Sequence, residues 1–138
     1  MLKIVGNIIW LLLGGIELAL AYAVAGIVMI ILIVTIPWGI GAFRLASYAL
    51  WPFGRKTVRA PSAGSILGNV IWIILAGWWL ALGHLIAALL SAITIIGIPF
   101  AVAHWRLAGL ALRPLGVDLV DADAPAPVDS VEIQGPPR

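Results

Sequence analysis

The sequence contains no cysteine and carries few charged residues. Without cysteine the chain forms no disulfide and offers no thiolate to a metal or a substrate. Charged residues make up 10% of the 138 residues and apolar residues 63%, whereas soluble domains average about 25% charged and about 45–50% apolar. A water-soluble fold of this size has too much surface to hide such a composition, so the sequence excludes that class.

Motifs of the common enzyme classes are also missing. The sequence has no Gly-x-x-x-x-Gly-Lys-Ser/Thr phosphate loop, and none of its serines lies in a nucleophile elbow. The two histidines, His84 and His104, have no acidic neighbours in sequence, which disfavours a metal site. We therefore expect no enzymatic activity, no cofactor, and no catalytic, cofactor-binding or metal-binding residues. The basic residues are too few to predict a nucleic-acid partner.

The chain instead contains one apolar unit twice. At an offset of 62 positions, residues 5–54 align with residues 67–116 without a gap, and 21 of the 50 aligned positions are identical. The apolar runs 4–50 and 66–112 each measure roughly 70 Å as helix at ~1.5 Å per residue, against ~30 Å for a hydrocarbon core. Each copy therefore has room for two crossings, and duplication in membrane proteins often places a site where the halves meet.

The fold class that we predict is an all-α integral membrane protein of two tandem helical-hairpin repeats with four transmembrane helices. Turns are expected near Ala21–Gly26 and Gly83–His84, although no strong helix breaker marks these boundaries. The helices are expected at 3–20, 23–50, 65–82 and 85–112.

The second helix of each hairpin carries a proline, Pro37 or Pro99, partway along its expected length. A proline inside a helix lacks an N–H and clashes with the preceding turn, so we predict a kink at each. The carbonyls freed by a kink can line a gate or coordinate an ion. The alternative is a kink that serves packing alone.

Four segments follow from this organisation. The membrane repeats occupy 1–54 and 65–116, a basic linker occupies 55–64, and the acidic Pro/Ala-rich tail 117–138 is expected to be disordered. Lysine and arginine gather in the linker, which predicts a multi-pass protein with the linker and both termini in the cytoplasm and with parallel repeats. A competing layout has one span per copy, at about 15–36 and 77–98, and makes the repeats inverted.

Three charged side chains lie within the apolar runs and are candidates for a pore or an ion contact. Arg44 and Arg106 occupy matched positions, where they either anchor the protein to lipid phosphates or form a ring that attracts anions in an oligomer. Glu17 either reaches interfacial water or lies at a pore mouth. Pro37 and Pro99 complete this candidate set.

Four further residues are predicted to serve helix packing. Asn7 and Asn69 stand one turn before Trp10 and Trp72 in the two copies. Amide side chains hydrogen-bond between membrane helices, so we expect the asparagines to hold the two copies together. His84 is expected at a span end, as an interfacial histidine with its hydrogen bonds satisfied.

Five short motifs occur in order along residues 2–117: Leu50-Trp51-Pro52-Phe53-Gly54, Gly68-Asn69-x-x-Trp72, Gly77-Trp78-Trp79-Leu80-x-x-x-His84, Ile95-Ile96-Gly97-Ile98-Pro99 and Leu112-Arg113-Pro114-Leu115-Gly116. With these motifs the chain resembles the YccF family of small bacterial inner-membrane proteins, whose members carry this domain twice. The resemblance implies a location in the bacterial inner membrane and assigns no activity. The first copy departs from the pattern, with Ile16, Glu17 and Tyr22 in place of the paired tryptophans and the histidine.

Composition and motifs leave three functional hypotheses, each with the lipid bilayer as a partner. The first is a homo-oligomeric ion channel that favours inorganic anions, with a pore between subunits because four short spans enclose little volume. The alternative is a non-catalytic membrane scaffold that docks a partner through the linker and tail. A weaker alternative is a small-solute transporter, since the predicted spans offer few polar residues to a polar solute.

Overall fold

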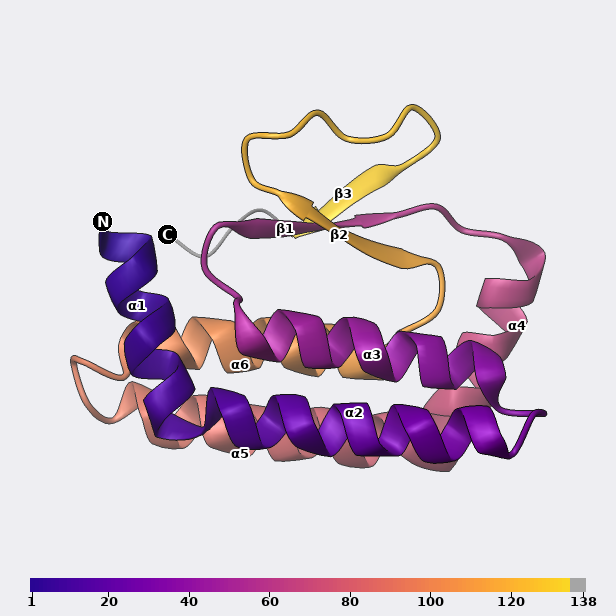
Figure 1. Cartoon of the computed structure of the whole chain (residues 1–138), viewed down its shortest axis with the longest axis horizontal. Helices are drawn as coiled ribbons and strands as arrows, with labels where there is room; N and C mark the ends of the chain where they lie inside the picture. The colour runs from indigo at the N-terminus through magenta and orange to yellow at the C-terminus, as the bar shows by residue number, and fades with distance from the viewer. Residues whose placement is uncertain (135–138) are drawn as a thin grey trace.

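The computed structural model describes residues 1–134 and consists of two copies of one helical unit that share a sheet (Figure 1). The first unit has α1 (Leu2–Trp10), a π-helical turn (Leu11–Gly15), α2 (Ile16–Ile31), α3 (Ile36–Leu50) and β1 (Arg55–Arg59). The second has α4 (Ala63–Trp72), a π-helical turn (Ile73–Gly77), α5 (Trp78–Ala92), α6 (Ile98–Leu112) and β2 (Val117–Asp121), and is followed by β3 (Val131–Gln134).

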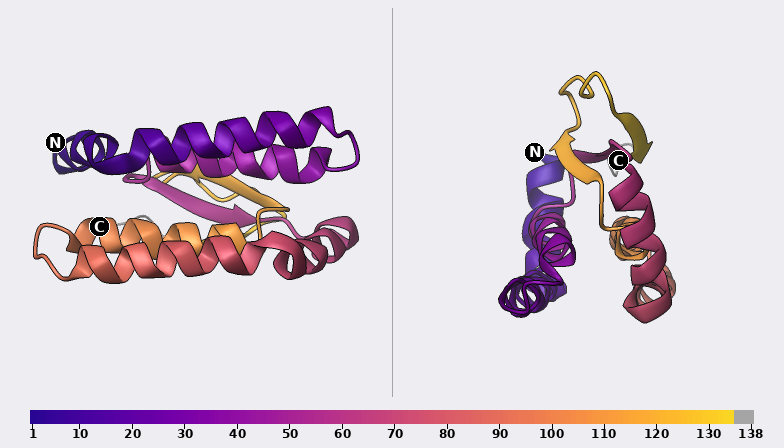
Figure 2. Two further views of the ribbon diagram at one scale, coloured as in Figure 1. Left: turned by 90° about the horizontal axis from the view of Figure 1, so that it is seen from below. Right: turned by 90° about the vertical axis from the view of Figure 1, so that its right-hand side faces the viewer.

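A pseudo-twofold axis relates the two units. β1 pairs antiparallel with β2 in a register that places Thr57 opposite Leu119, its equivalent 62 positions later. Among the helices, Tyr22 contacts His84, which is likewise its equivalent. The axis therefore runs from the middle of the β1–β2 pair down between the α2–α3 and α5–α6 hairpins, which lie on either side of it (Figure 2).

α1 meets α2 at a sharp bend (Figure 1), and two glycines permit it. Gly14 has φ 137°, a backbone conformation that residues with a side chain rarely adopt. A Cβ on Gly15 would lie 2.5 Å from the Trp10 ring, so only glycine lets the indole fold back over the turn. Through this arrangement Trp10 Nε1 donates to the Ala49 carbonyl oxygen at 2.6 Å and ties the bend to the end of α3.

The chain reverses later in each copy than the sequence predicts. The expected turns near Ala21–Gly26 and Gly83–His84 lie inside α2 and α5, so these boundaries are wrong. The reversals occur at 32–35 and 93–97 and consist almost wholly of apolar residues. Composition does not mark them, because these loops are as apolar as the helices that they join.

The predicted proline kinks are also wrong. Pro37 and Pro99 stand in the first turn of α3 and α6. The N–H groups of a first helical turn have no acceptor within the helix, so proline begins a helix without losing a hydrogen bond. Each proline therefore marks the start of a helix, and the second helix of each hairpin is shorter than predicted.

The linker and the tail join in one sheet, so the chain is mostly helical rather than all-α. β1 lies in the predicted linker, whereas β2 and β3 lie in the tail, where the prediction of disorder is wrong for these strands. The strand order is β2-β1-β3, and both neighbours run antiparallel to β1. The sheet and the N-terminus lie on the same side of the helical hairpins (Figure 1).

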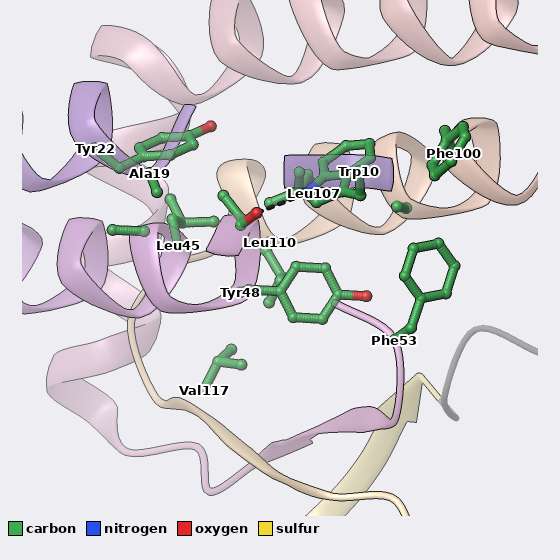
Figure 3. Close-up of a cluster of buried hydrophobic side chains, with 13 residues drawn as sticks. Trp10, Ala19, Tyr22, Leu45, Tyr48, Phe53, Phe100, Leu107, Leu110 and Val117 are labelled. Atoms are coloured by element: carbon green, nitrogen blue, oxygen red, sulfur yellow. Dashed lines mark hydrogen bonds between the residues drawn. The ribbon is translucent and has the colours of Figure 1, made fainter. Parts of the chain in front are cut away.

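The core contains residues of α1, α2, α3 and α6 and extends to Val117 of β2 (Figure 3). Tyr48 and Leu107 are fully buried there, and Trp10 packs against Phe100 with the ring centroids 5.9 Å apart. Because the core draws on both repeats, the two units form one packed body beneath the sheet.

Within residues 1–134, two helical segments are long and apolar enough to cross a membrane by length and composition, Leu2–Ile31 and Ala63–Ala92, each of 30 residues. α3 and α6 have 15 residues each, which is about 22 Å of helix. Four crossings therefore stay a prediction. The apolar surface continues over the hairpin tips, where Ile33 is 73% and Ile95 87% exposed, whereas most charged residues gather at the sheet.

Candidate functional site at the pseudo-twofold axis

Two polar side chains, Tyr22 and His84, meet on the axis and a third, His104, contacts His84 from beside it, all within otherwise apolar helices. Tyr22 Oη of α2 lies 2.5 Å from His84 Nε2 of α5. His84 Nδ1 lies 3.2 Å from Nδ1 of His104 on α6. Tyr22 is 8% and His84 6% exposed, so the contact between them is buried. We call these three residues the polar triad.

The helical period places the first two members of the triad. The buried residues of each helix recur at intervals of three or four, which puts them on one face. That face contains Ala19, Tyr22 and Gly26 in α2, and Ala81, His84 and Ala88 in α5. Tyr22 and His84 thus occupy the middle of matching faces, and the twofold relation brings them together.

Two arrangements of protons satisfy both contacts with all three groups neutral. In the first, the Tyr22 hydroxyl donates to His84 Nε2 and the His84 Nδ1–H donates to His104 Nδ1. In the second, the His104 Nδ1–H donates to His84 Nδ1 and the His84 Nε2–H donates to the Tyr22 oxygen. Both arrangements engage both ring nitrogens of His84, and either makes the triad a directed chain of hydrogen bonds that joins α2, α5 and α6.

A cavity of about 380 Å³ lies beside the triad, between the two hairpins. Its size falls within the range of about 300–1,000 Å³ that is typical of small-molecule pockets. Equivalent residues of both repeats line it: Leu18 and Leu80, Ala21 and Gly83, Tyr22 and His84, Ala25 and Ala87, Ala42 and His104. We call it the axis cavity. Its walls are apolar except at the triad, so it can surround a hydrocarbon group and offer hydrogen bonds at one place.

The two arginines of the candidate set lie outside the axis cavity. Arg44 Nη2 forms an ion pair with Asp118 Oδ1 of β2 at 3.1 Å, which links α3 of one repeat to the strand of the other. The Arg44 side chain is 38% and the Asp118 side chain 63% exposed, so water screens the pair and it contributes about 0–1 kcal/mol to stability. Arg106, the equivalent residue on α6, is half-buried. The structure does not bring the two arginines together.

Glu17 is exposed in the first turn of α2, at the bend after Gly14 and Gly15. It lines a second cavity, of about 370 Å³, whose wall also includes His104. This cavity approaches the polar triad from the side of the bend. Pro37 and Pro99 line neither cavity.

The asparagines act within each repeat, so the hypothesis that they hold the two copies together is wrong. Asn7 Nδ2 donates to the Phe53 carbonyl oxygen and the Phe53 N–H donates to Asn7 Oδ1, both at 3.1 Å. Asn69 makes the same pair of bonds to Leu115 at 3.0 Å. Each amide thereby fixes the segment after α3 or α6 to the first helix of its own unit.

The tryptophans also bond within their repeats. Trp72 Nε1 donates to the Ala111 carbonyl oxygen at 2.8 Å, as Trp10 does to Ala49. Each indole therefore supplies a donor to a carbonyl in the last turn of a helix, where the helix itself has none.

Sequence reasoning did not identify the polar triad. It placed His84 at a span end and treated Tyr22 only as a departure from a motif, whereas both are buried in mid-helix. The sequence did contain one signal. Positions 22 and 84 are equivalent in the two repeats, yet they carry different hydrogen-bonding side chains, a tyrosine and a histidine, within apolar surroundings. The described part of the chain contains no group of three or more His, Asp or Glu residues able to hold a metal ion.

Known proteins resemble this chain over both copies of its repeat. A family model described as the inner membrane component domain YccF matches residues 5–55 and again residues 67–117. The chain is 32% identical over 134 residues to the inner membrane protein YccF of Escherichia coli (strain K12), covering 88% of this chain and 90% of that protein. The protein of the same name from Shigella flexneri matches to the same extent. No solved structure matches the chain.

Proposed function

Because the chain belongs to the YccF family of inner-membrane proteins, we propose that it is a non-catalytic protein of the bacterial inner membrane that binds a small, mostly apolar molecule in the axis cavity. The observation that supports this function is the apolar cavity with one polar triad in its wall. The matching ligand is a membrane-dissolved molecule with a hydrocarbon body and a single hydroxyl or carbonyl group.

The cavity wall sets this ligand class. Burying a polar group without a hydrogen bond costs roughly 2–7 kcal/mol, so a molecule with several polar groups is disfavoured against the apolar wall. Near the triad, the Tyr22 hydroxyl can form a second hydrogen bond, and His104 Nε2 takes part in neither triad contact, so one polar group of a ligand finds a partner there. The ligand therefore enters from the lipid phase and is oriented by its polar end.

Filling the cavity tests this function. In vesicles containing the full chain, a long-chain alcohol that carries a photoreactive diazirine is expected to label α2 and α5 saturably. Ala87→Phe places a ring in the cavity and is expected to reduce this labelling about tenfold, equivalent to the loss of about 1.4 kcal/mol of binding free energy. Leu89→Phe is the matched control, because Leu89 is an exposed residue of the same helix.

Labelled peptides identified by mass spectrometry decide the result. Labelling that excess unlabelled alcohol does not displace, or that is equal in Ala87→Phe and Leu89→Phe, would contradict the proposed function. Saturable labelling that is lost only in Ala87→Phe would support it.

An ion channel that favours anions is the second candidate, formed between subunits of a homo-oligomer. Its support is the half-buried Arg106, since Arg44 is already paired with Asp118. Single-channel recording in planar bilayers, together with the oligomeric state in nanodiscs, distinguishes it from ligand binding alone. A silent, monomeric protein would count against the channel, and recovery of a stoichiometric partner would favour a scaffold.

We also infer that the sheet faces the cytoplasm. Arg55, Lys56 and Arg59 lie in β1, beside the apolar body, and positively charged loops stay on the cytoplasmic side. The N-terminus and the sheet share one side of the helices (Figure 1). Reporters fused at Ala60 and at the C-terminus are therefore expected to give cytoplasmic signals, and opposite signals would contradict this topology.

A further inference from the structure

A further cavity, of about 470 Å³ and with polar side chains in its wall, lies between the sheet and the end of α6. Thr57 and Arg59 of β1 line it together with Arg113, the residue that follows α6. It shares no lining residue with the axis cavity. An inference about it is therefore independent of the function proposed for the triad. We call it the sheet cavity.

Two guanidinium groups are held at the sheet cavity. Arg59 Nη2 donates to the Arg113 carbonyl oxygen at 3.3 Å, which keeps the two residues together. Burial and the nearby Arg113 charge lower the pKa of Arg59. The acid at the cavity wall, Glu132, forms an ion pair with Lys56 at 3.4 Å. Within the described part of the chain, neither arginine has an ion-pair partner.

The cavity wall also contains unused hydrogen-bonding atoms. Thr57 Oγ1 and Arg59 Nε are buried, and neither has a partner among the side chains that the structure describes. Thr57 is 1% exposed. Buried polar atoms are rarely left without a partner, and one that the protein leaves unsatisfied is usually completed by a ligand, an ion or a water molecule. A hydroxyl and guanidinium N–H groups are the donors that suit the oxygens of a phosphate group.

Part of the wall of the sheet cavity is apolar and leads onto an exposed face of α6. Leu110 and Val117 lie in its wall beside Arg113. Val102, Trp105, Gly109 and Arg113 follow at intervals of three and four along α6, which places them on one helix face. Trp105 on this face is 64% exposed. A hydrocarbon chain can lie along the face with its polar end at Arg113.

We propose that the sheet cavity binds the phosphate group of an anionic phospholipid whose acyl chain lies along α6. The site combines β1 of the first unit with the end of α6 in the second. At the pseudo-symmetric end of the sheet, Leu119 and Asp121 of β2 take the places of Thr57 and Arg59, and Trp51 takes the place of Arg113. An aspartate in place of an arginine repels a phosphate, so the pseudo-symmetric end of the sheet has no such site.

Thermal unfolding of the full chain in a neutral detergent tests this proposal. Short-chain phosphatidylglycerol is expected to raise the unfolding temperature saturably, because a ligand that binds only the folded state stabilises it. Phosphatidylcholine with the same acyl chains should act more weakly, and inorganic phosphate should have no effect at the same concentration. Arg113→Gln and Thr57→Val are each expected to weaken the apparent affinity for phosphatidylglycerol about tenfold, the loss of one strong hydrogen bond.

Lys3→Gln is the matched control, since Lys3 is an exposed cation at the other end of the sheet. The Arg113 side chain is exposed and the Thr57 hydroxyl has no described partner, so we expect both variants to fold, with an unchanged far-ultraviolet circular dichroism spectrum. Equal affinity in Arg113→Gln and Lys3→Gln, or no saturable shift with phosphatidylglycerol, overturns the proposal. If inorganic phosphate raises the unfolding temperature as much as phosphatidylglycerol does, the cavity is a site for free phosphate and the proposal of a lipid ligand is wrong.

Discussion

Asn7→Ala is expected to destabilise the folded protein by about 2–4 kcal/mol, which is the cost of two buried backbone groups left without partners. The Asn7 amide is fully buried, and it both donates to and accepts from Phe53. Alanine restores neither bond, so the N–H and the carbonyl of Phe53 both lose their partner. Unfolding by sodium dodecyl sulfate in maltoside micelles, followed by circular dichroism, measures the change.

Ile8→Ala is the control on the same helix, because Ile8 is about half exposed. We expect it to change the free energy of unfolding by less than about 0.5 kcal/mol. Asn69→Ala is expected to repeat the loss seen for Asn7→Ala, since Asn69 makes the same two bonds to Leu115. An unfolding midpoint for Asn7→Ala equal to that of Ile8→Ala would refute this account of the amide.

Gly15→Ala is expected to cost about 2–4 kcal/mol, from overpacking together with the loss of a buried hydrogen bond. The new Cβ would lie 2.5 Å from Trp10 Cδ1 and 3.0 Å from the backbone oxygen of Ala49. The indole must then move, and its bond to Ala49 is lost. The same detergent titration measures the effect, and a red shift of tryptophan fluorescence is expected to accompany it.

Gly83→Ala provides the matched control within α5. No atom lies within 4 Å of a Cβ built on Gly83. Alanine is favoured over glycine inside a helix by about 0.5–1 kcal/mol, so this variant is expected to be more stable than the wild type. If Gly15→Ala and Gly83→Ala change the free energy of unfolding in the same direction, the close approach of Trp10 does not determine the effect of the substitution at Gly15.

Part of this fold could be predicted from the sequence because it depends on local pattern and composition. The offset of 62 positions defines the two units, and the runs of apolar residues define the helical body. The chain reversals could not be placed, because Leu32–Val34 and Ile95–Ile96 are as apolar as their flanking helices. Pro37 and Pro99 were recognised, but a proline signals either a helix start or a kink, and only the position of the reversal decides between them.

The sheet could not be predicted because its strands are distant in sequence. β1 and β2 are short, and each follows a helix of its own repeat. Arg55 pairs with Asp121 and Arg59 with Val117, so neither strand has a partner until both repeats have folded. The acidic composition of the tail suggested disorder, but Val117 is buried against the core, and burial of that kind is a tertiary effect.

The candidate site could be predicted only in part, because it too depends on contacts between residues that are distant in sequence. Arg44, Arg106 and Glu17 attracted notice because a charge in an apolar run is conspicuous. Tyr22 and His84 differ less from their surroundings, and only the twofold arrangement shows that these equivalent positions touch. The sequence therefore indicated where charges lie, and the three-dimensional structure showed which polar groups are joined.

The position of Tyr22 and His84 on the axis has a consequence for the duplication itself. In a symmetric dimer of a single repeat, a side chain on the axis must face its own copy. Two tyrosines or two histidines would then face each other, and a hydrogen bond between them would break the symmetry, because one group must donate and its identical partner must accept. Joining the repeats in one chain removes that restriction, because the two equivalent positions are then encoded separately and the residue at one can be substituted without the other. A phenol facing an imidazole is a combination that a fused gene can encode and that a self-associating half-length ancestor cannot.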